Sequence, residues 1–139
     1  MKPEQIARAG TEHAHQTALM CWCNLNLEKY PELKWIHSIP NGGDRDKIVA
    51  GKLKAEGVKA GVWDLFLPVD NTLYNGIYIE MKKPGREQDM LGGLSQKQKD
   101  FGMFVHEQGY STFVCYHWEQ ARDVLVEYLD MRKTLSKHL

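Results

Sequence analysis

The chain has 139 residues, and its 18 basic and 18 acidic side chains give a formal net charge of zero. This length favours a single domain, residues 1–139, that buries a core without disulfide or metal staples. A balanced charge excludes attraction of an acidic partner by an overall field, so a nucleic-acid-binding chain would depend on local basic patches. The sequence contains no apolar run of about eighteen residues and no apolar signal near its start, so we expect neither a membrane span nor secretion.

Three cysteines, Cys21, Cys23 and Cys115, form an odd set without the spacing of a disulfide framework, which suits a reducing cytoplasm. Cys21 and Cys23, with His13 and His15 nearby, raise the question of a zinc site. Residues two apart on a helix differ by about 200° around its axis and point to opposite sides. We therefore interpret these four side chains as ordinary helix residues.

In chain order, the first predicted element is a helix over residues 11–29, capped by Thr11 and stopped by the following proline. The segment "LKWIHSI", residues 33–39, then predicts a short strand. In "PNGGDRDK" the Asn-Gly pair can signal a hairpin, but the apolar residues after it have helical spacing. This spacing favours a helix with Asp44 as its N-cap and Gly57 as its end.

Strands are expected near residues 63–68 and 76–82, joined by a polar loop and paired antiparallel. The charged, glycine-rich residues 84–94 predict a mobile loop. Ser95 and Gln98 then predict a capping box at the start of a further helix. The residues expected to point inward from that helix are Phe101, Phe104 and Val105.

Gly109 is expected to end this helix, after which "YSTFVCY", residues 110–116, predicts a buried strand. The last element is an amphipathic helix containing Ala121, Val124, Leu125, Tyr128 and Leu129 on one face. The resulting order α-β-α-β-β-α-β-α predicts an α/β fold, with a mixed sheet covered by helices on both faces.

Charged residues interrupt the two most apolar segments, "GVWDLFLP" and "GIYIEMKKPG". Because side chains alternate along a strand, Glu80 and Lys82 share one face, while Ile79 and Met81 take the other. Asp64, on the neighbouring strand, can reach the Glu80 side. Burying these charges requires compensation, either by a salt bridge of Lys82 or by a divalent cation on the two carboxylates. The pattern alone leaves both solutions open.

Asp64 followed by Glu80-x-Lys82 resembles the PD-(D/E)xK nuclease motif. Several motifs in order, "EHAHQ", "IHSIPNGG", "LKAEGVKAGVWDLFLP", "GIYIEMKKPG", "LSQKQKDF" and "EQGYSTFVCY", resemble more specifically the VRR-NUC family, in the form of its small stand-alone members. This resemblance covers about residues 11–130 and implies a restriction-endonuclease-like fold. The family usually has proline where this chain has Trp63. Proline supplies no ligand atom, and strand alternation directs Trp63 away from Asp64 into the interior, so we expect proline to be tolerated there.

The resemblance implies a DNA endonuclease dependent on Mg²⁺ or Mn²⁺. The implied metal ligands are Asp64, Glu80 and the backbone carbonyl of Met81, with Glu12 completing the shell. Lys82 would position the attacking water and stabilise developing charge. The implied catalytic residues are thus Asp64, Glu80, Lys82, Gln96 and Glu12. By their positions alone, Gln96 could equally be a solvated residue, and Glu12 a favourable charge at a helix N-terminus.

A glycine turn before a helix N-terminus can hold a phosphate group, and basic residues beside it can follow a DNA backbone. A plain turn with solvated charges explains the same residues equally well. The residues expected to contact DNA are Asn41, Gly42, Gly43, Arg45, Lys47, Lys83, Arg86, Lys97 and Lys99.

Small stand-alone VRR-NUC proteins resemble junction-resolving enzymes. The resemblance therefore implies structure-selective cleavage of branched DNA, as by a Holliday-junction resolvase, by a homodimer. It also implies the cytoplasm of a bacterial cell or of a phage-infected host. Two alternatives stay open: a nicking or restriction-type nuclease, and a catalytically silent DNA-binding module of the same fold.

Overall fold

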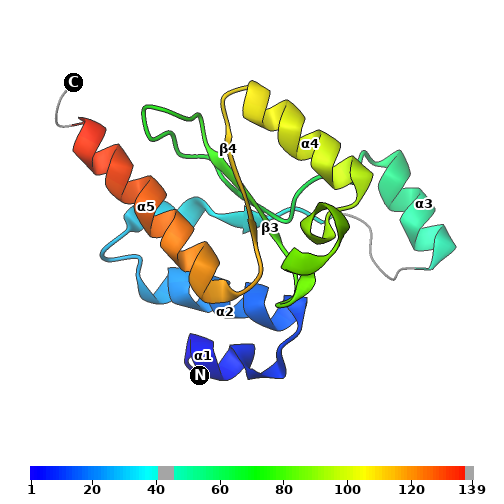
Figure 1. The fold of residues 1–139 in the computed structure, drawn as a ribbon, viewed down its shortest axis with the longest axis horizontal. Coiled ribbons are helices and arrows are strands. Elements are labelled where there is room, and N and C mark those ends of the chain that lie inside the picture. The colour runs from blue at the N-terminus through cyan, green and yellow to red at the C-terminus, as the bar shows by residue number, and fades with distance from the viewer. Residues whose placement is uncertain (41–45, 137–139) are drawn as a thin grey trace.

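A four-stranded mixed sheet, in the order β1-β2-β3-β4, forms the centre of the computed structural model, which describes residues 1–40 and 46–136 (Figure 1). Strands β1, β2 and β3 pair antiparallel in succession, and β3 pairs parallel with β4. The pairing of β2 with β3 confirms the hairpin expected from the two apolar segments. The strand bounds are β1 His37–Ser38, β2 Leu65–Leu67, β3 Ile77–Met81 and β4 Ser111–Cys115.

Helices surround this sheet. The α-helices of the described residues are α1 Pro3–Ile6, α2 Glu12–Leu25, α3 Lys47–Ala55, α4 Gln96–Glu107 and α5 Trp118–Ser136. The 3₁₀ helices are η1 Ala7–Ala9, η2 Pro31–Trp35, η3 Arg86–Gln88 and η4 Met90–Gly93. With α1 and the 3₁₀ turns set aside, the order α2-β1-α3-β2-β3-α4-β4-α5 is the expected one, and the α/β class is confirmed.

The main core lies on the face of β3 that carries Ile77, Ile79 and Met81. Each of these side chains is at most 1% exposed, and they form one cluster with Leu19 of α2 and Leu125 of α5. Strand alternation predicted this set because every second residue of the strand turns to the same side. Because this face of β3 packs in the core, the other face, which carries Glu80, is turned toward α4.

Helix α4 covers that second face. The ring of Phe101 meets the ring of Tyr78 edge to face, with centroids 5.2 Å apart. The expected capping box of Ser95 and Gln98 is present at its start. Val105 is buried as expected, but Phe104 is 59% exposed, so the inward direction expected for it was wrong. Phe104 lies at the edge of the apolar stripe, beyond the reach of the sheet.

Helix α2 is shorter than expected, although Thr11 caps it by accepting the N–H of Ala14 at 3.0 Å. It ends at Leu25 rather than at residue 29. The reason is Asn26, whose side-chain amide donates to the carbonyl of Trp22 at 2.8 Å and so satisfies a carbonyl of the last turn.

Two further boundaries differ from those expected. Pro31–Trp35 forms a 3₁₀ helix, and only His37–Ser38 joins the sheet, because proline suits the first position of a helix and not a strand ladder. Asp46 caps α3, accepting N–H groups of Ile48 and Val49 at 2.9 Å each. Asp44, the expected cap, lies outside the described residues.

The segment expected as a loop over residues 84–94 contains η3 and η4. Arg86 pairs with Asp89 across η3, which ties this segment to itself. Strand β4 is also less buried than expected, since Phe113 is 45% exposed. This exposure follows from its place at the edge of the sheet.

His15 and Cys23 of α2 serve the helix packing, whereas His13 is exposed and Cys21 is half-buried. Cys23 is fully buried in the core, and Nδ1 of His15 accepts the N–H of Trp118 at 3.0 Å, joining α2 to the start of α5. Across residues 1–40 and 46–136, no helix combines the length and the apolar character needed to cross a membrane.

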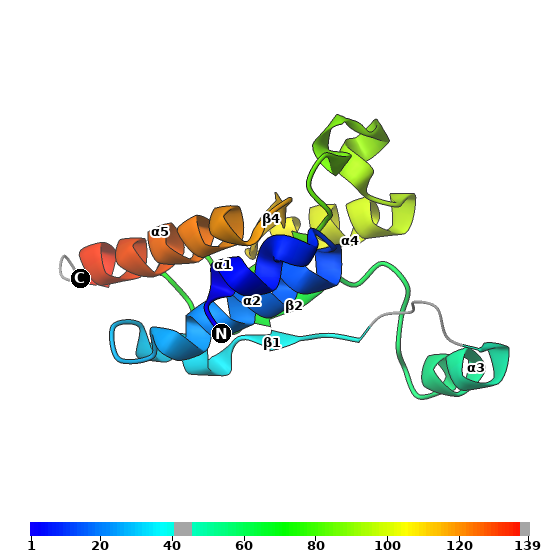
Figure 2. The same cartoon turned by 90° about the horizontal axis from the view of Figure 1, so that it is seen from below.

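Helix α3 stands apart from the sheet (Figure 2). None of its residues is buried, and Ile48 is 73% exposed. Its exposed lysines are therefore available to a large partner.

Candidate metal centre

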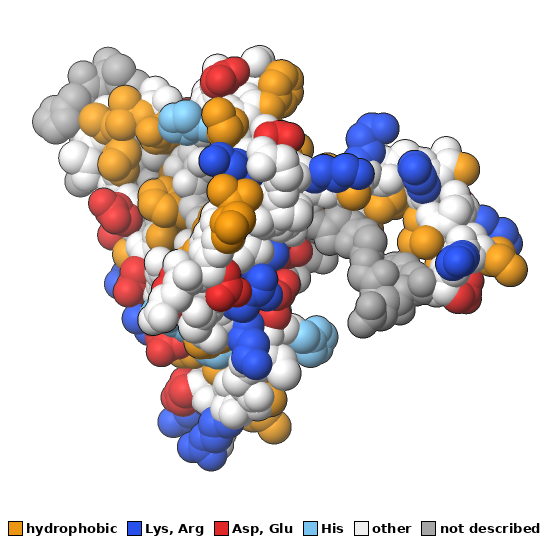
Figure 3. All heavy atoms as spheres, turned by 45° about the vertical axis from the view of Figure 1, so that its right-hand side comes forward, with side chains coloured by type: hydrophobic (Ala, Val, Ile, Leu, Met, Phe, Trp, Pro, Cys, Tyr) orange, Lys and Arg blue, Asp and Glu red, His pale blue; other side chains and the backbone are white. Residues whose placement is uncertain are grey.

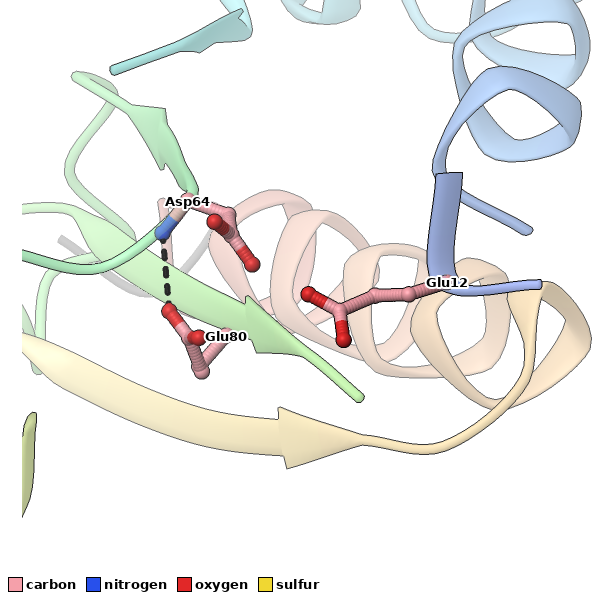
Figure 4. Close-up of side chains that lie close together, drawn as sticks. All are labelled: Glu12, Asp64 and Glu80. Carbon is pink, nitrogen blue, oxygen red and sulfur yellow. Dashed lines mark hydrogen bonds between the residues drawn. The ribbon is translucent and has the colours of Figure 1, made fainter. Parts of the chain in front are cut away.

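Three carboxylates from separate elements meet beside the sheet: Glu12 from the first turn of α2, Asp64 immediately before β2, and Glu80 in β3 (Figure 4). One oxygen of each lies within 4.8 Å of the others. The antiparallel register, which pairs Leu65 with Ile79, brings Asp64 opposite Glu80. The expected convergence of these carboxylates is therefore present in the structure.

Backbone hydrogen bonds hold two of the carboxylates in place. The N–H of Asp64 donates to Oε1 of Glu80 at 3.0 Å, drawn as the dashed line in Figure 4. In return, the N–H of Met81 donates to Oδ2 of Asp64 at 3.0 Å. Each strand thus orients the carboxylate of the other through its backbone. The ligand role expected for the carbonyl of Met81 stays a prediction.

Burial disfavours the charged forms of these carboxylates. It raises the pKa of Glu80, which is 1% exposed, and the neighbouring charge of Asp64 raises that pKa further. Burial also raises the pKa of Asp64. Burial raises the pKa of Glu12, while the charge of Lys82 opposes this shift. A centre that holds carboxylates at this energetic cost favours either protons or a bound cation.

Lys82 compensates part of this charge. Its side chain is 11% exposed, and its Nζ lies 3.4 Å from Oε2 of Glu80 and 3.1 Å from Oε1 of Gln98. The salt bridge that the sequence allowed is therefore present. One ammonium group faces three carboxylates, however, so protons or a bound cation would compensate the remaining charge.

The donor set suits a hard divalent cation. Three carboxylate oxygens are the kind of ligands preferred by Mg²⁺ and Mn²⁺, and the cluster includes neither thiolate nor imidazole groups. The acidic triad of Glu12, Asp64 and Glu80 could thus hold a divalent metal.

Gln98, rather than Gln96, reaches the carboxylates, and the catalytic role expected for Gln96 stays a prediction. The side-chain N–H of Gln98 donates to Oε2 of Glu80 at 2.9 Å, whereas the amide of Gln96 donates to Asp100 at 2.8 Å on the exposed side of α4. Residues two positions apart on a helix lie about 200° apart around its axis, so Gln96 and Gln98 cannot both face the carboxylates. The capping box is the sequence signal for the contact of Gln98, because it turns the Gln98 side chain back toward the helix start.

Trp63 is buried, as expected, with 4% of its surface exposed. Its ring lies against α4, however, and its Nε1–H donates to the carbonyl of Gln98 at 2.8 Å. Proline could supply neither the ring nor the donor. The tolerance of proline at this position stays a prediction, and the loss of these two contacts counts against it.

Several of the expected DNA-contact residues are exposed. Asn41, Gly42, Gly43 and Arg45 lie outside the described residues. The exposed ones are Lys47, at the start of α3, Lys83 and Arg86 after β3, and Lys97 and Lys99 in the first turns of α4. Arg86 is also exposed, but its side chain pairs with Asp89.

The sequence reasoning missed a further basic group. A hollow of about 510 Å³ between α3 and the start of α4 is lined by three lysines, Lys54, Lys59 and Lys97, and by the apolar residues Ala50, Leu53, Val58 and Ala60. Figure 3 shows basic side chains around α3 and on the side of the body that faces it. Lys54 and Lys59 are visible in the sequence as neighbouring basic residues. Their position beside Lys97 depends on the tertiary fold.

No family model and no curated protein matches the chain. A solved structure described as a "VRR_NUC domain protein" matches it with a TM-score of 0.69 and 28% sequence identity, covering 87% of this chain and 89% of that chain. The mixed sheet flanked by helices is consistent with a restriction-endonuclease-like fold. The resemblance indicated by the sequence motifs is thereby confirmed: over most of its length, this chain is similar in fold and sequence to a VRR-NUC nuclease domain.

Proposed function

We propose that this chain is a DNA endonuclease that hydrolyses phosphodiester bonds with Mg²⁺ or Mn²⁺. The observation that carries the proposal is the acidic triad, in which oxygens of Glu12, Asp64 and Glu80 lie within 4.8 Å of one another. The similarity to a VRR_NUC domain protein supports the same function. A divalent cation held by the triad supplies Lewis acidity that polarises the scissile phosphate and activates water.

Lys82 stabilises charge in this mechanism. Its Nζ is held between Glu80 and Gln98, which keeps the ammonium beside the carboxylates and limits its motion. Adjacent carboxylates favour the protonated lysine, which opposes a role as general base. The ammonium instead orients the attacking water and balances the negative charge that develops on the phosphate.

Gln98 takes the role first assigned to Gln96. Its amide binds both Glu80 and Lys82, so it fixes the relative orientation of a metal ligand and of the positive charge. We assign the carbonyl of Met81 as a further oxygen ligand, because its residue follows Glu80 and its N–H already binds Asp64.

The DNA backbone follows the exposed basic residues around the triad. Lys83, Lys97 and Lys99 supply positive charge near the scissile phosphate, and Lys47, Lys54 and Lys59 extend it along α3 and the segment after it. Such contacts position the duplex without reading its sequence. This arrangement suits recognition of DNA shape.

The substrate we propose is branched DNA, cut by a homodimer in the manner of a Holliday-junction resolvase. The described residues of one domain carry a single triad, whereas a two-fold dimer presents two triads for paired incisions. The cytoplasm of a bacterial cell or of a phage-infected host, where DNA is accessible and the three free thiols are stable, is the setting we propose.

The enzyme is favoured over a silent DNA-binding module by the complete set of Glu12, Asp64, Glu80 and Lys82. A module that only bound DNA would gain nothing from burying carboxylates that repel phosphate. A nicking or restriction-type nuclease shares this centre and differs in its substrate.

Cleavage assays separate these functions. Purified protein is incubated with end-labelled single-stranded, duplex, flap, splayed and four-way DNA, each with Mg²⁺, with Mn²⁺ or with a chelator. We expect metal-dependent cleavage that is fastest on branched DNA. Equal cleavage of linear duplex would favour the restriction-type nuclease, and binding without cleavage in either metal would favour the silent module.

A further inference from the structure

Trp63 and Gly102 form a fitted pair between the start of β2 and helix α4. The indole ring is 4% exposed, and its Nε1–H donates to the carbonyl of Gln98 at 2.8 Å. A Cβ atom built on Gly102 would lie 2.4 Å from Cζ2 of this ring. Only glycine leaves room for the indole at this point, so the ring packs directly on the backbone of the first turns of α4.

This pair closes a ring of contacts around Glu80. Trp63 is bonded through the chain to Asp64, whose N–H donates to Oε1 of Glu80 at 3.0 Å. The other carboxylate oxygen, Oε2, accepts the side-chain N–H of Gln98 at 2.9 Å. The carbonyl of Gln98 in turn accepts the indole N–H of Trp63. Both groups that orient the Glu80 carboxylate are therefore tied to Trp63.

The contacts of Gln98 with the sheet require the first turn of α4 to be held in position. The side chain of Gln98 accepts the N–H of Ser95 at 2.9 Å within the capping box, and this local contact persists wherever the helix moves. Its contacts with Glu80 and Lys82 cross to the sheet and depend on where the helix lies. At its C-terminal end α4 is tied by Asn75, whose N–H donates to the carbonyl of Gly109 at 2.7 Å. The indole supplies the corresponding tie at the N-terminal end.

We propose that Trp63 is a positioning residue of the nuclease centre: its indole N–H, fitted against Gly102, anchors α4 so that the amide of Gln98 holds Glu80 and Lys82 in line with Asp64. Its effect on catalysis rests on the proposed function. The anchoring of α4 does not, because it is present in the metal-free protein. The proline usual in the family has no N–H donor, so this anchoring hydrogen bond is a feature of this chain.

The test substitutes Trp63→Phe, which keeps an aromatic ring and removes the donor. Trp35→Phe is the matched control, because Trp35 is 60% exposed. The first readout is the NMR spectrum of the metal-free protein. We expect the indole N–H of Trp63 to exchange slowly with solvent, and Trp63→Phe, but not the control, to shift the side-chain amide resonances of Gln98.

The second readout is kinetic. Residues that orient metal ligands typically alter metal affinity or activity by about 10- to 100-fold. We therefore expect Trp63→Phe to lower kcat within that range and to raise the Mg²⁺ concentration for half-maximal rate, with KM for DNA nearly unchanged. Gly102→Ala, which forces the ring off the helix while keeping its N–H, is expected to shift the same resonances.

If Trp63→Phe fails to fold, benzothienylalanine at position 63 keeps the shape of the ring and replaces its N–H by sulfur. Unmoved Gln98 resonances in a folded variant overturn the proposal, as does a loss of kcat that only matches the loss of folded protein. The failure of the nuclease function is distinguishable: wild-type protein would then not cleave DNA in Mg²⁺ or Mn²⁺, while Trp63→Phe would still shift the Gln98 resonances.

Discussion

The side-chain amide of Gln98 donates to Oε2 of Glu80 across 2.9 Å, joining the first turn of α4 to the buried carboxylate of β3. The oxygen of the same amide accepts from Ser95 in the capping box and from Nζ of Lys82. One side chain thus starts a helix and orients two charged groups of the candidate metal centre. The local signal for a helix start and the signal for the site coincide at this residue.

Gln98→Ala is expected to lower kcat by about 10- to 100-fold, because it releases both Glu80 and Lys82. Gln96→Ala, at an exposed position in the same turn, is the matched control and should leave kcat unchanged. Steady-state cleavage kinetics measure the difference, and circular dichroism checks that α4 survives the loss of its cap. A larger loss in the Gln96 variant than in the Gln98 variant would contradict the assignment.

The metal-free protein should lose stability as the pH rises. Burial, together with the charge of Asp64, raises the pKa of Glu80 from 4.5 to about 8. Since the folded state binds this proton more tightly than the unfolded state, its contribution is full below pH 4.5 and disappears as the pH rises through about 8. Urea unfolding between pH 5 and 8 (~1-unit steps) in a chelator measures this slope.

Glu80→Gln serves as the control in that experiment, because it removes the titrating group and should flatten the slope. Mn²⁺ should reverse the trend in wild-type protein, since a cation stabilises the charged carboxylates most where protons compete least. An unfolding free energy that is equally pH-dependent in the Glu80→Gln variant would show that other groups cause the slope.

The lysines of the hollow between α3 and α4 should carry DNA affinity. The double variant Lys54→Gln, Lys59→Gln is expected to weaken binding to all sequences alike and to reduce the salt dependence of log Kd by about two, one for each lost phosphate contact. Fluorescence anisotropy at several salt concentrations measures both effects. Lys29→Gln with Lys34→Gln, outside this hollow, makes the same charge change and should alter neither. Equal effects of the two pairs would remove α3 from the DNA interface.

Dimerisation is expected at micromolar concentration. Light scattering should give twice the 16.0 kDa mass of the chain, and the same preparation should cut a four-way junction faster than a linear duplex of matched sequence. A monomeric mass would contradict the dimer. Equal rates on both substrates would contradict structure selectivity while leaving the nuclease chemistry intact.

Strand alternation and helix caps predicted the parts of the centre that depend on local geometry. Glu80 and Met81 face opposite sides because they are neighbours in β3, and Ser95 begins α4 because its hydroxyl accepts an N–H of the first turn. These relations involve only a few consecutive residues. They are visible in the sequence for that reason.

The remaining contacts depend on where distant segments meet. Nothing near Trp63 in the sequence reveals that its ring lies on Gly102. The resemblance implies Gln96, whereas the contact of Gln98 with Glu80 depends on the tertiary fold. Such contacts are set by packing and by hydrogen bonds across the fold.

The most direct measurement is the metal dependence of DNA cleavage by wild-type protein and by two shape-preserving variants, Asp64→Asn and Glu80→Gln. Glu107→Gln, on the exposed side of α4, is the matched control. Wild type and control should cut DNA with Mg²⁺ or Mn²⁺ and stop in a chelator. The two variants should fold and bind DNA but cut at least about 1,000-fold more slowly, since several kcal/mol of charge stabilisation are lost. Wild-type cleavage in the chelator, or cleavage by either variant at the wild-type rate, would contradict a metal-dependent nuclease centred on these carboxylates.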